Sequence, residues 1–325
     1  MNLKNKNIYL ISPRFFNYEN DIIQEIKKFG ANVKYYDERP FQSILGKALL
    51  RFNIRPLIQK RINSYFERNI IKNAHNIDYL LIINPESIPS YVLSQLKKIN
   101  KNIRIIIYMW DSFANKKSAI KLIPYSDRFF TFDPNDAKKY SLELLPLFFT
   151  SEYSNINTVN NFQFDACFIG TAHSQRFDIA KKITLGLDKS YLFFYTPSIF
   201  VFFYKKIILR ELKGLTISNI STKKMSKESI IDIINHSKSI IDISHPSQVG
   251  LTMRTFETIG AKRKLITTNS EIEKYDFYHK NNIFCLSEGT TQDELNEFLS
   301  LPYVDTLEHL YEKYKLSNWV SSLFK

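Results

Sequence analysis

The polar residues best suited to binding chemistry follow an apolar run, IIDIS, in the second half of the chain. The loop after this run contains Ser247, Gln248 and Gly250, and a predicted helix begins just before Thr252. In a parallel α/β sheet such a loop lies at the carboxyl edge of the strands, where free N–H groups and the helix dipole favour an anion. The pattern therefore predicts a diphosphate-binding loop.

Arg254 and Glu257 lie three residues apart on the same predicted helix. Arg254 could neutralise a diphosphate, and Glu257 could accept hydrogen bonds from ribose hydroxyls. The same spacing is also that of an ordinary exposed ion pair, so this simpler interpretation stays open.

A second candidate follows the buried run DACFIG. There Gly170 and Thr171 lead into a predicted helix, a pattern that looks like the first strand-to-helix turn of a Rossmann-type unit. His173 and Arg176 could face a diphosphate from the other wall of a cleft. Taken singly, each is also common as a solvated residue near a helix start.

Carboxylates follow the strand-like runs of the first half. Asp111 comes directly after a buried strand and is the first candidate for a general base, although it could equally cap the following turn. Glu86 occupies a similar position after YLLIIN and is the alternative base. Asp136 is predicted to cap the helix that carries Tyr140.

Two parallel sheets flanked by helices are needed to position these residues. Apolar runs alternate with amphipathic stretches throughout, which predicts an α/β fold. In the first half, strands are predicted at 8–12, 33–36, 79–84, 103–110 and 128–132, and helices at 20–29, 41–74, 90–99, 117–123 and 136–144. In the second half, strands are predicted at 164–170, 191–195, 215–218, 239–243, 264–267 and 283–285, and helices at 227–236, 251–259 and 291–299.

The domain boundary is predicted at a polar stretch, SEYSNINTVNN, in the middle of the chain. It separates two predicted domains, 1–150 and 162–325. The final run, 304–324, is predicted to be helical and could cross back to the first domain.

The stretch SQVGLTMRTFETIGAKRKLITTN resembles the donor-binding motif of GT-B glycosyltransferases. More narrowly, the chain looks like the lipopolysaccharide and capsule biosynthesis transferases of bacteria, distant relatives of CgeB-like proteins. Residues 37–40 (DERP), 108–112 (YMWDS) with Asn115, 132–133 (FD) with Asp136, Ala137 and Tyr140, and 145–147 (LPL) carry this narrower resemblance.

The resemblance implies two Rossmann-like domains with a cleft between them: 1–150 would bind the acceptor and 162–325 the nucleotide sugar. It also implies transfer of a hexose-like sugar from a nucleotide donor to a surface-glycan acceptor. UDP is the first choice of nucleotide. Glu257 would bind ribose, Arg254 a phosphate, and Gly170-Thr171 would form the phosphate-facing turn. The E-x7-E pair of many retaining members is missing, because Val249 and Leu265 stand eight residues before and after Glu257. This favours inversion.

Several classes of chemistry lack their usual patterns. No zinc-type spacing, Walker A motif or DxD-like pair occurs in the sequence, so no metal or cofactor is expected. Cys167 and Cys285 lie in apolar runs and are predicted to be structural thiols. The N-terminal residues look like a first core strand and no span is long enough for a bilayer, which predicts a cytoplasmic protein.

Charge is concentrated in the first half, with 24 basic against 13 acidic residues, compared with 21 against 19 in the second. The basic amphipathic segment 46–72 could rest on an anionic membrane or receive a phosphate-bearing lipid acceptor, or its apolar face could simply join the core. The aromatic and basic segment 200–210 has the same two interpretations. Nucleic acid is not expected, since no motif for it occurs.

Two other functions remain open at this stage. A sugar-nucleotide epimerase of the same fold would have the same diphosphate site but no acceptor face. A basic protein that binds surfaces without catalysis would need neither.

Overall fold

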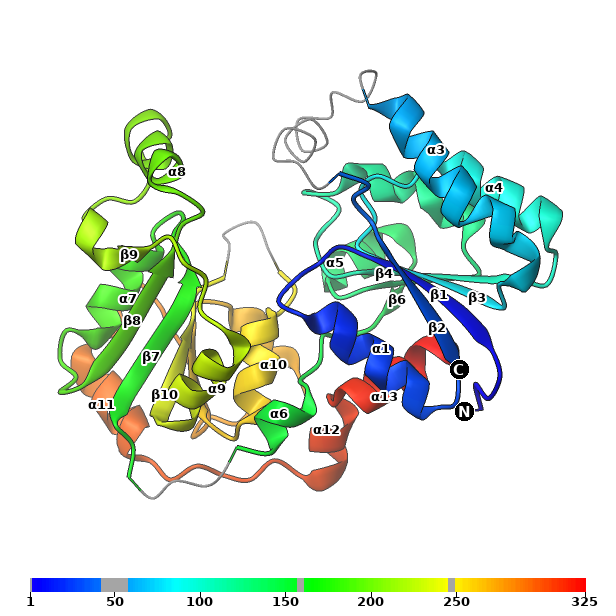
Figure 1. Cartoon of the computed structure of the whole chain (residues 1–325). Coiled ribbons are helices and arrows are strands. Elements are labelled where there is room, and N and C mark those ends of the chain that lie inside the picture. The colour runs from blue at the N-terminus through cyan, green and yellow to red at the C-terminus, as the bar shows by residue number, and fades with distance from the viewer. Residues whose placement is uncertain (1, 42–57, 157–160, 245–248) are drawn as a thin grey trace. The chain divides into compact units, whose positions relative to one another are not determined.

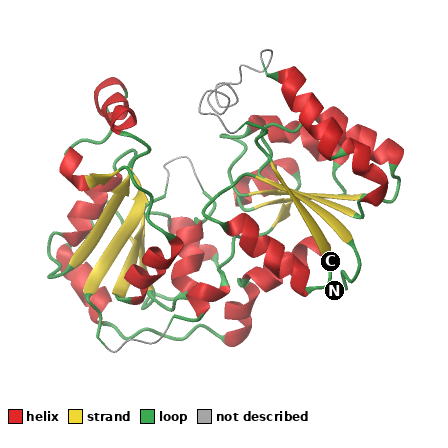
Figure 2. Ribbon diagram, in the orientation of Figure 1, coloured by secondary structure: helices red, strands yellow, loops and turns green. Residues whose placement is uncertain are grey.

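The computed structural model describes residues 2–41, 58–156, 161–244 and 249–325 (Figure 1). The chain divides into two compact units. Unit 1 is Met1–Pro146 with Leu316–Lys325, and unit 2 is Leu147–Lys315. Figure 2 shows that each unit consists of one sheet flanked by helices.

The sheet of unit 1 is parallel. Its described strands lie in the order β2-β1-β3-β4-β5-β6. They are β1 (Asn7–Ser12), β2 (Asn32–Asp37), β3 (Tyr79–Ile83), β4 (Arg104–Met109), β5 (Arg128–Thr131) and β6 (Glu143–Leu144). The helices are α1 (Tyr18–Lys28), α3 (Gln59–Asn69), η2 (Ile71–Asn76), α4 (Ser90–Ile99), η3 (Lys117–Tyr125) and α5 (Pro134–Tyr140). The central strands are almost wholly apolar because helices cover both of their faces.

Helix α13 (Leu316–Phe324) belongs to unit 1 although it follows unit 2 in the sequence. It lies beside α1 (Figure 1), and its Trp319 packs edge-on against Tyr108 of β4 at 4.8 Å between ring centroids. Arg128 donates hydrogen bonds to the carbonyl groups of Ser322 and Leu323 at 2.9 and 3.2 Å.

The sheet of unit 2 is also parallel, and its described strands lie in the order β12-β11-β10-β7-β8-β9. They are β7 (Phe164–Thr171), β8 (Ser190–Tyr195), β9 (Ile220–Ser221), β10 (Ser237–Asp242), β11 (Lys264–Thr267) and β12 (Ile283–Cys285). The helices are α6 (Ser151–Ser154), α7 (Arg176–Thr184), α8 (Ile199–Phe203), η4 (Tyr204–Ile208), η5 (Ile217–Asn219), α9 (Lys227–Asn235), α10 (Met253–Gly260), η6 (Ser270–Lys274), α11 (Gln292–Ser300) and α12 (Glu308–Lys313).

Strands β7 and β10 are neighbours, and the strand order reverses between them. Ala166 and Cys167 of β7 pair with Ser239 and Ile240 of β10. Ligands of doubly wound sheets bind outside the carboxyl ends of the strands at such a switch point. The topology therefore directs attention to the loops after β7 and β10.

Two predicted elements are wrong. The expected strand at 215–218 is a turn of 3-10 helix, η5, because Thr216 and Asn219 cap it through reciprocal side-chain hydrogen bonds. The expected helix at 136–144 ends at Tyr140, since Ser141 adopts a left-handed conformation with φ of 53°. Glu143–Leu144 then pairs with β5 as a short strand.

The predicted helix at 41–74 is described only from residue 58 onward, where α3 and η2 lie; 42–57 fall outside the described residues. The apolar face of α3 joins the core of unit 1 through Ile62 and Phe66, while Arg61 and Arg68 are exposed. Over the whole described part of the chain, helices fall short of the length and apolar character that crossing a bilayer requires.

Candidate functional site

Because β7 and β10 are neighbours, the segments that lead from them into α7 and α10 leave the same carboxyl edge of the sheet. β7 runs through Gly170-Thr171 into α7, and β10 runs through the loop that contains Gly250 into α10. Ser247 and Gln248, two predicted ligands of this loop, lie outside the described residues. Gly250 is described and buried.

Arg176, the first residue of α7, turns back toward the end of β7. Its Nη1 atom donates to the carbonyl oxygen of Thr171 at 3.4 Å, and among the described residues its buried Nε atom has no hydrogen-bond partner. Burial lowers the pKa of this guanidinium below its ordinary value, the Asp242 charge opposes the shift, and the Arg254 charge adds to it. The influence of Asp242 and Arg254 shows that the three charges share one region.

Gly170 leaves the room that Arg176 occupies. A Cβ atom at position 170 would lie 2.8 Å from the Phe168 ring and 3.2 Å from Nη1 of Arg176. Both separations are tighter than ordinary van der Waals contact, so a larger residue would push the guanidinium away.

Asp242, at the end of β10, is a site residue that sequence reasoning missed. It is buried and accepts hydrogen bonds from the hydroxyls of Thr252 and Thr255 at 2.7 and 2.8 Å. Thr252 caps α10 by accepting from the N–H of Thr255. The signal was a lone carboxylate inside the apolar run IIDI, where an unpartnered charge would be costly.

Arg254 and Glu257 form an ion pair with 2.6 Å between Nη1 and Oε2. The simpler interpretation of this pair as exposed is wrong, because the two side chains are only 17% and 5% exposed. Tyr153 of α6 packs beside them, and burial together with the Glu257 charge raises the pKa of its hydroxyl. Glu257 is thus well placed to hold Arg254, and its expected ribose contact stays a prediction.

The arrangement suits a ligand with two negative charges. Two guanidinium groups stand at the starts of α7 and α10, where helix N–H groups and dipoles add positive potential. The nearby Asp242 carboxylate already accepts hydrogen bonds from two hydroxyl groups, those of Thr252 and Thr255. Gly170, Thr171, Arg176, Thr252 and Arg254 lie at the ends of β7 and the starts of α7 and α10, and their role in binding a diphosphate stays a prediction. His173 contacts Ser174, with 3.1 Å between Nδ1 and Oγ, and its predicted place facing a diphosphate also stays a prediction.

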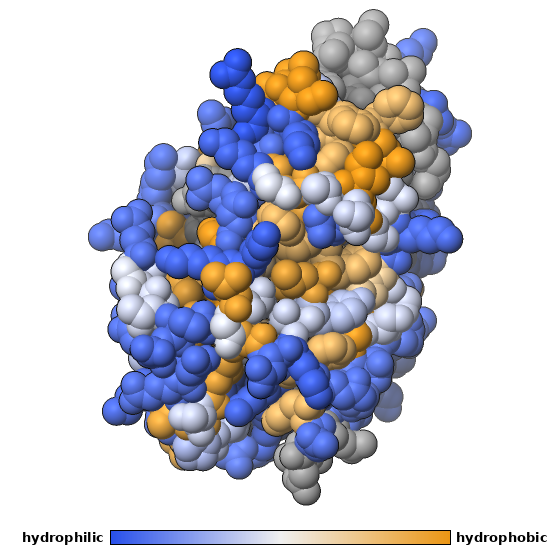
Figure 3. All heavy atoms as spheres, turned by 90° about the vertical axis from the view of Figure 1, so that its left-hand side faces the viewer, coloured by the Kyte–Doolittle hydropathy of each residue, from blue (hydrophilic) through white to orange (hydrophobic). Residues whose placement is uncertain are grey.

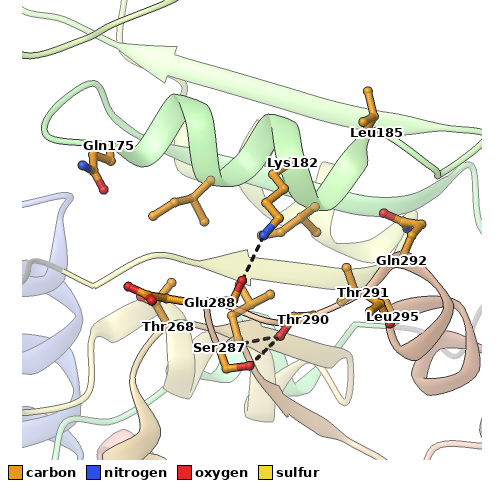
Figure 4. A pocket seen from close by; sticks show the side chains of 13 residues that line it. Gln175, Lys182, Leu185, Thr268, Ser287, Glu288, Thr290, Thr291, Gln292 and Leu295 are labelled. Carbon is orange, nitrogen blue, oxygen red and sulfur yellow. Dashed lines mark hydrogen bonds between the residues drawn. The ribbon is translucent and has the colours of Figure 1, made fainter.

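A cavity of about 430 Å³ lies on the same face of the sheet as α7, between that helix and α11 (Figure 4). Lys182 points into it from α7 and donates to the Glu288 carbonyl at 3.5 Å. Gln175 lies at one end, next to Arg176 in the sequence. Of the predicted donor-binding residues that the structure describes, none lines this cavity.

The corresponding edge of unit 1 is rich in carboxylates. Glu38 follows β2, is fully buried, and accepts backbone hydrogen bonds from Glu86 at 2.7 Å, from Ser87 and from Ile88 at 3.3 Å. Its Oε2 atom is buried and has no hydrogen-bond partner in the described ranges. Burial raises the pKa of Glu38 to about 7, although the N–H groups of Ser87 and Glu86 oppose the shift. This residue was not singled out as a site residue.

Glu86, the alternative base, lies between two cations. Its carboxylate is 2.7 Å from Lys116 and 3.3 Å from Arg39. Burial alone would raise the pKa of Glu86, but the hydrogen bond and charge of Lys116, together with Arg39, outweigh burial and lower it. An ion-paired carboxylate with a lowered pKa is a weak proton acceptor, so this environment argues against Glu86 as a general base.

Asp111 lies just past β4, at the start of a turn. Its Oδ1 atom accepts from the Ser112 N–H at 3.0 Å and from the Asn115 side chain at 2.8 Å. These bonds make it a turn cap, and a carboxylate has further lone pairs for a substrate hydroxyl. The preceding Trp110 packs against the exposed ring of Phe15, with 5.8 Å between ring centroids.

The predicted cap of α5 is wrong. Asp133, not Asp136, caps the helix by accepting from the N–H groups of Asn135 and Asp136 at 2.9 and 3.2 Å. Pro134 takes the first helical position, where a missing N–H costs nothing, and so moves the start of the helix upstream. Asp136 instead accepts from the Phe113 N–H at 2.7 Å and fixes the turn after Asp111.

The remaining sequence expectations concern sulfur and metals. Cys167 is buried and Cys285 half-buried, and both are free thiols. Within the described ranges no three His, Cys, Asp or Glu side chains are grouped as a metal site would need. The expectation of a metal-independent reaction stays a prediction.

Comparison with known proteins defines the fold. No family model and no curated sequence matches the chain. A glycosyltransferase from Rickettsia africae ESF-5 is similar at a TM-score of 0.60 and 12% identity, covering 98% of this chain and 96% of the other. A UDP-forming α,α-trehalose-phosphate synthase from Burkholderia vietnamiensis gives 0.60 and 9%, covering 98% and 99%. A UDP-GlcNAc 2-epimerase from Neisseria meningitidis, bound to UDP-GlcNAc, gives 0.52 and 10%, covering 98% of each chain.

The chain therefore has the GT-B fold, with two Rossmann-like domains, as the sequence predicted. At such identities the likeness establishes the fold alone. No sequence match supports the narrower lipopolysaccharide, capsule or CgeB-like grouping.

Proposed function

We propose that the protein is a glycosyltransferase that moves a sugar from a nucleotide donor to a glycan acceptor. The donor is a nucleoside diphosphate sugar, with UDP as the first choice. The acceptor is a lipopolysaccharide, capsule or other bacterial surface glycan, free or lipid-linked, that the protein meets at the cytoplasmic face of the membrane.

The observation that carries this proposal is the pair of arginines at the switch point of unit 2. Within the part of the chain that the structure describes, the buried Nε–H of Arg176 has no acceptor, and Arg254 is held nearby by Glu257. A buried donor without an acceptor is costly, and a bound phosphate oxygen would supply one. The GT-B neighbours that use or bind UDP compounds support a diphosphate as that ligand.

The proposed reaction is an inverting displacement. Asp111 accepts the proton of an acceptor hydroxyl, the hydroxyl oxygen attacks the anomeric carbon, and the bond to the diphosphate breaks. Arg176 and Arg254 stabilise the charge that develops on the leaving diphosphate. The chain's own cations thus do what a metal ion could otherwise do, so the proposal includes no metal.

A sugar-nucleotide epimerase is the second candidate. The similarity to the Neisseria meningitidis epimerase favours it, since the same diphosphate site would serve. The excess of basic residues in the first half, 24 against 13 acidic, favours a transferase with an anionic or membrane-bound acceptor. An epimerase converts its donor alone, whereas a transferase releases nucleoside diphosphate only when an acceptor or water takes the sugar.

Nucleotide binding tests the proposal. We would titrate UDP, GDP, CMP, dTDP and their sugars into the wild type, Arg176→Met and Lys262→Met by calorimetry. Lys262 is an exposed cation that pairs with Asp305, so its variant removes the same charge elsewhere. We expect one nucleotide to bind, with affinity about 100-fold lower in Arg176→Met, since a charged hydrogen bond is worth about 1.5–3 kcal/mol. Binding of none of them, or equal binding by both variants, would contradict the proposal.

A further inference from the structure

The helical segment after β8 exposes large apolar side chains to solvent. Thr196-Pro197-Ser198 ends the strand, the Ser198 hydroxyl accepts from the Val201 N–H at 3.2 Å, and α8 continues directly into the π-helical turn η4. Figure 1 shows α8 projecting from the sheet of unit 2 beyond the ends of β8 and β9.

The exposed residues of this helix form one stripe. Six large side chains recur in adjacent pairs every four residues, which is the spacing of one helix face. Their exposed fractions are 47% for Ile199, 87% for Phe200, 42% for Phe203, 55% for Tyr204, and 64% for both Ile207 and Ile208. Leu209, directly after them, is 47% exposed.

The polar side chains point the other way. Lys205 donates to the Ala172 carbonyl at 2.9 Å, and Lys206 donates to the Leu215 carbonyl while lying over the buried ring of Phe202. In α3 the arrangement is the ordinary one, with Ile62 buried and Arg61 exposed. α8 and η4 therefore expose their apolar side to solvent, while Lys205 and Lys206 hydrogen-bond to backbone carbonyls of unit 2.

Basic residues surround the stripe. Arg210 and Lys213 follow η4, and Lys223 and Lys224 follow β9, which pairs with β8. Residues 199–224 contain six basic and one acidic residue, whereas the rest of 151–325 has 15 basic and 18 acidic. Residues 199–224 thus carry a net charge of +5, whereas the rest of this half has a net charge of −3.

A space-filling view agrees with this distribution. Figure 3 faces the side of unit 2 that carries α8, and hydrophobic side chains gather at its upper end beside strongly hydrophilic ones. An apolar stripe of aromatic and branched residues flanked by Lys and Arg is the composition of a helix that lies in a membrane interface.

We propose that α8 and η4 dock unit 2 onto an anionic membrane, with the stripe inserted among the lipids and the flanking cations on their headgroups. This inference rests on the proposed function, because membrane docking would bring a glycosyltransferase to a lipid-linked acceptor. The helix leaves the same sheet edge that carries Arg176, so docking would hold the diphosphate site close to the lipid surface.

Vesicle sedimentation tests the docking surface. We would mix the full chain with vesicles of phosphatidylcholine alone and of phosphatidylcholine with one quarter phosphatidylglycerol. The wild type is expected to bind the anionic vesicles at least tenfold more tightly. Phe200→Ser/Ile207→Ser should lose at least tenfold in this binding, and Arg210→Glu/Lys213→Glu should abolish the preference for anionic lipid.

Leu185→Ser/Leu307→Ser is the matched control, because these leucines are 79% and 63% exposed but lie outside the stripe. It should bind vesicles as the wild type does. Equal binding by Phe200→Ser/Ile207→Ser and this control would overturn the proposal, as would equal binding to both vesicle types. A concentration-dependent dimer in light scattering that Phe200→Ser/Ile207→Ser abolishes, without vesicle binding, would show a second copy as the occupant and also overturn it.

Nucleotide titration of Phe200→Ser/Ile207→Ser separates the two proposals. Retained nucleotide affinity with lost vesicle binding supports docking as a property of its own. If the wild type binds nucleotide but no vesicle, only the membrane proposal fails. If it binds vesicles but no nucleotide, the proposed function fails.

Discussion

The two sheets have related topologies but opposite charges at their carboxyl edges. In unit 2, Arg176 and Arg254 stand in the first turns of α7 and α10, the helices that follow β7 and β10. In unit 1 the loops after β2, β3 and β4 bring Glu38, Glu86 and Asp111 to the corresponding edge. One edge is suited to holding an anion, and the other to accepting a proton.

Each edge also neutralises part of its own charge. Glu257 pairs with Arg254 in unit 2, and Lys116 pairs with Glu86 in unit 1. Among the described residues of these edges, the Nε–H of Arg176 and the Oε2 atom of Glu38 have no hydrogen-bond partner. The carboxylate of Asp111 accepts hydrogen bonds from Ser112 and Asn115 of its own turn and has further lone pairs for a substrate hydroxyl. The comparison teaches that the sheets supply equivalent positions and that the loops decide the chemistry.

The largest expected effect is that of Asp111→Asn, which removes the proposed base. We expect kcat for sugar transfer to fall by about 10²–10⁴ with unchanged nucleotide affinity, because an amide cannot accept the proton. Steady-state kinetics and calorimetry measure the two quantities. Asp188→Asn, an exposed change in unit 2, is the control. A larger loss of kcat in Glu86→Gln than in Asp111→Asn would show that Glu86, and not Asp111, is the general base.

The next effect concerns Glu38 and pH. Its pKa is about 7 when folded, against 4.5 for an ordinary glutamate, so between these values the unfolded chain has lost a proton that the folded chain keeps. Stability of the wild type should therefore fall as pH rises from 4.5 to 7, by about 3 kcal/mol. Glu38→Gln should lose this dependence, and exposed Glu67→Gln should keep it.

Urea unfolding followed by tryptophan fluorescence measures this change in unit 1. The two tryptophans of the chain, Trp110 and Trp319, both belong to that unit. The same slope with pH in Glu38→Gln and the wild type would show that the buried carboxyl does not titrate in this range. The carboxyl edge of unit 1 would then lack the proton-accepting character, at Glu38, that distinguishes it from the edge of unit 2.

The smallest effect is that of Gly170→Ala. The added methyl would press on Phe168 and displace Arg176, so nucleotide affinity should fall about tenfold, or about 1.4 kcal/mol. Gly289→Ala is the control, because a Cβ there meets nothing within 4 Å. Calorimetry on both variants measures the difference. Equal affinities would mean that the position of Arg176 does not decide binding.

Most of the fold could be predicted because buried parallel strands have long apolar runs. β11 and β12 match their predicted bounds, and α4 does as well. β6 could not be predicted, since its two exposed residues become a strand only by pairing with β5. Local spacing also could not show that Pro134 makes Asp133 the cap of α5.

The candidate site was predictable only in part. Glycine turns and arginines at helix starts carry a sequence signal, and the structure places Gly170 beside Arg176. Asp242 and Glu38 act through burial, which depends on contacts with distant segments such as Thr255 and Ser87. The outward orientation of α8 depends on lysine contacts with Ala172 and Leu215, which a helical pattern cannot reveal.

The assignment of α13 to unit 1 also bears on how the chain is made. Unit 2 is in effect an insertion between β6 and α13, so a ribosome must translate all of Leu147–Lys315 before Trp319 can reach Tyr108. Until then the face of β4 that receives this ring stays uncovered. Unit 2 can therefore complete its fold during synthesis before unit 1, although unit 1 emerges first.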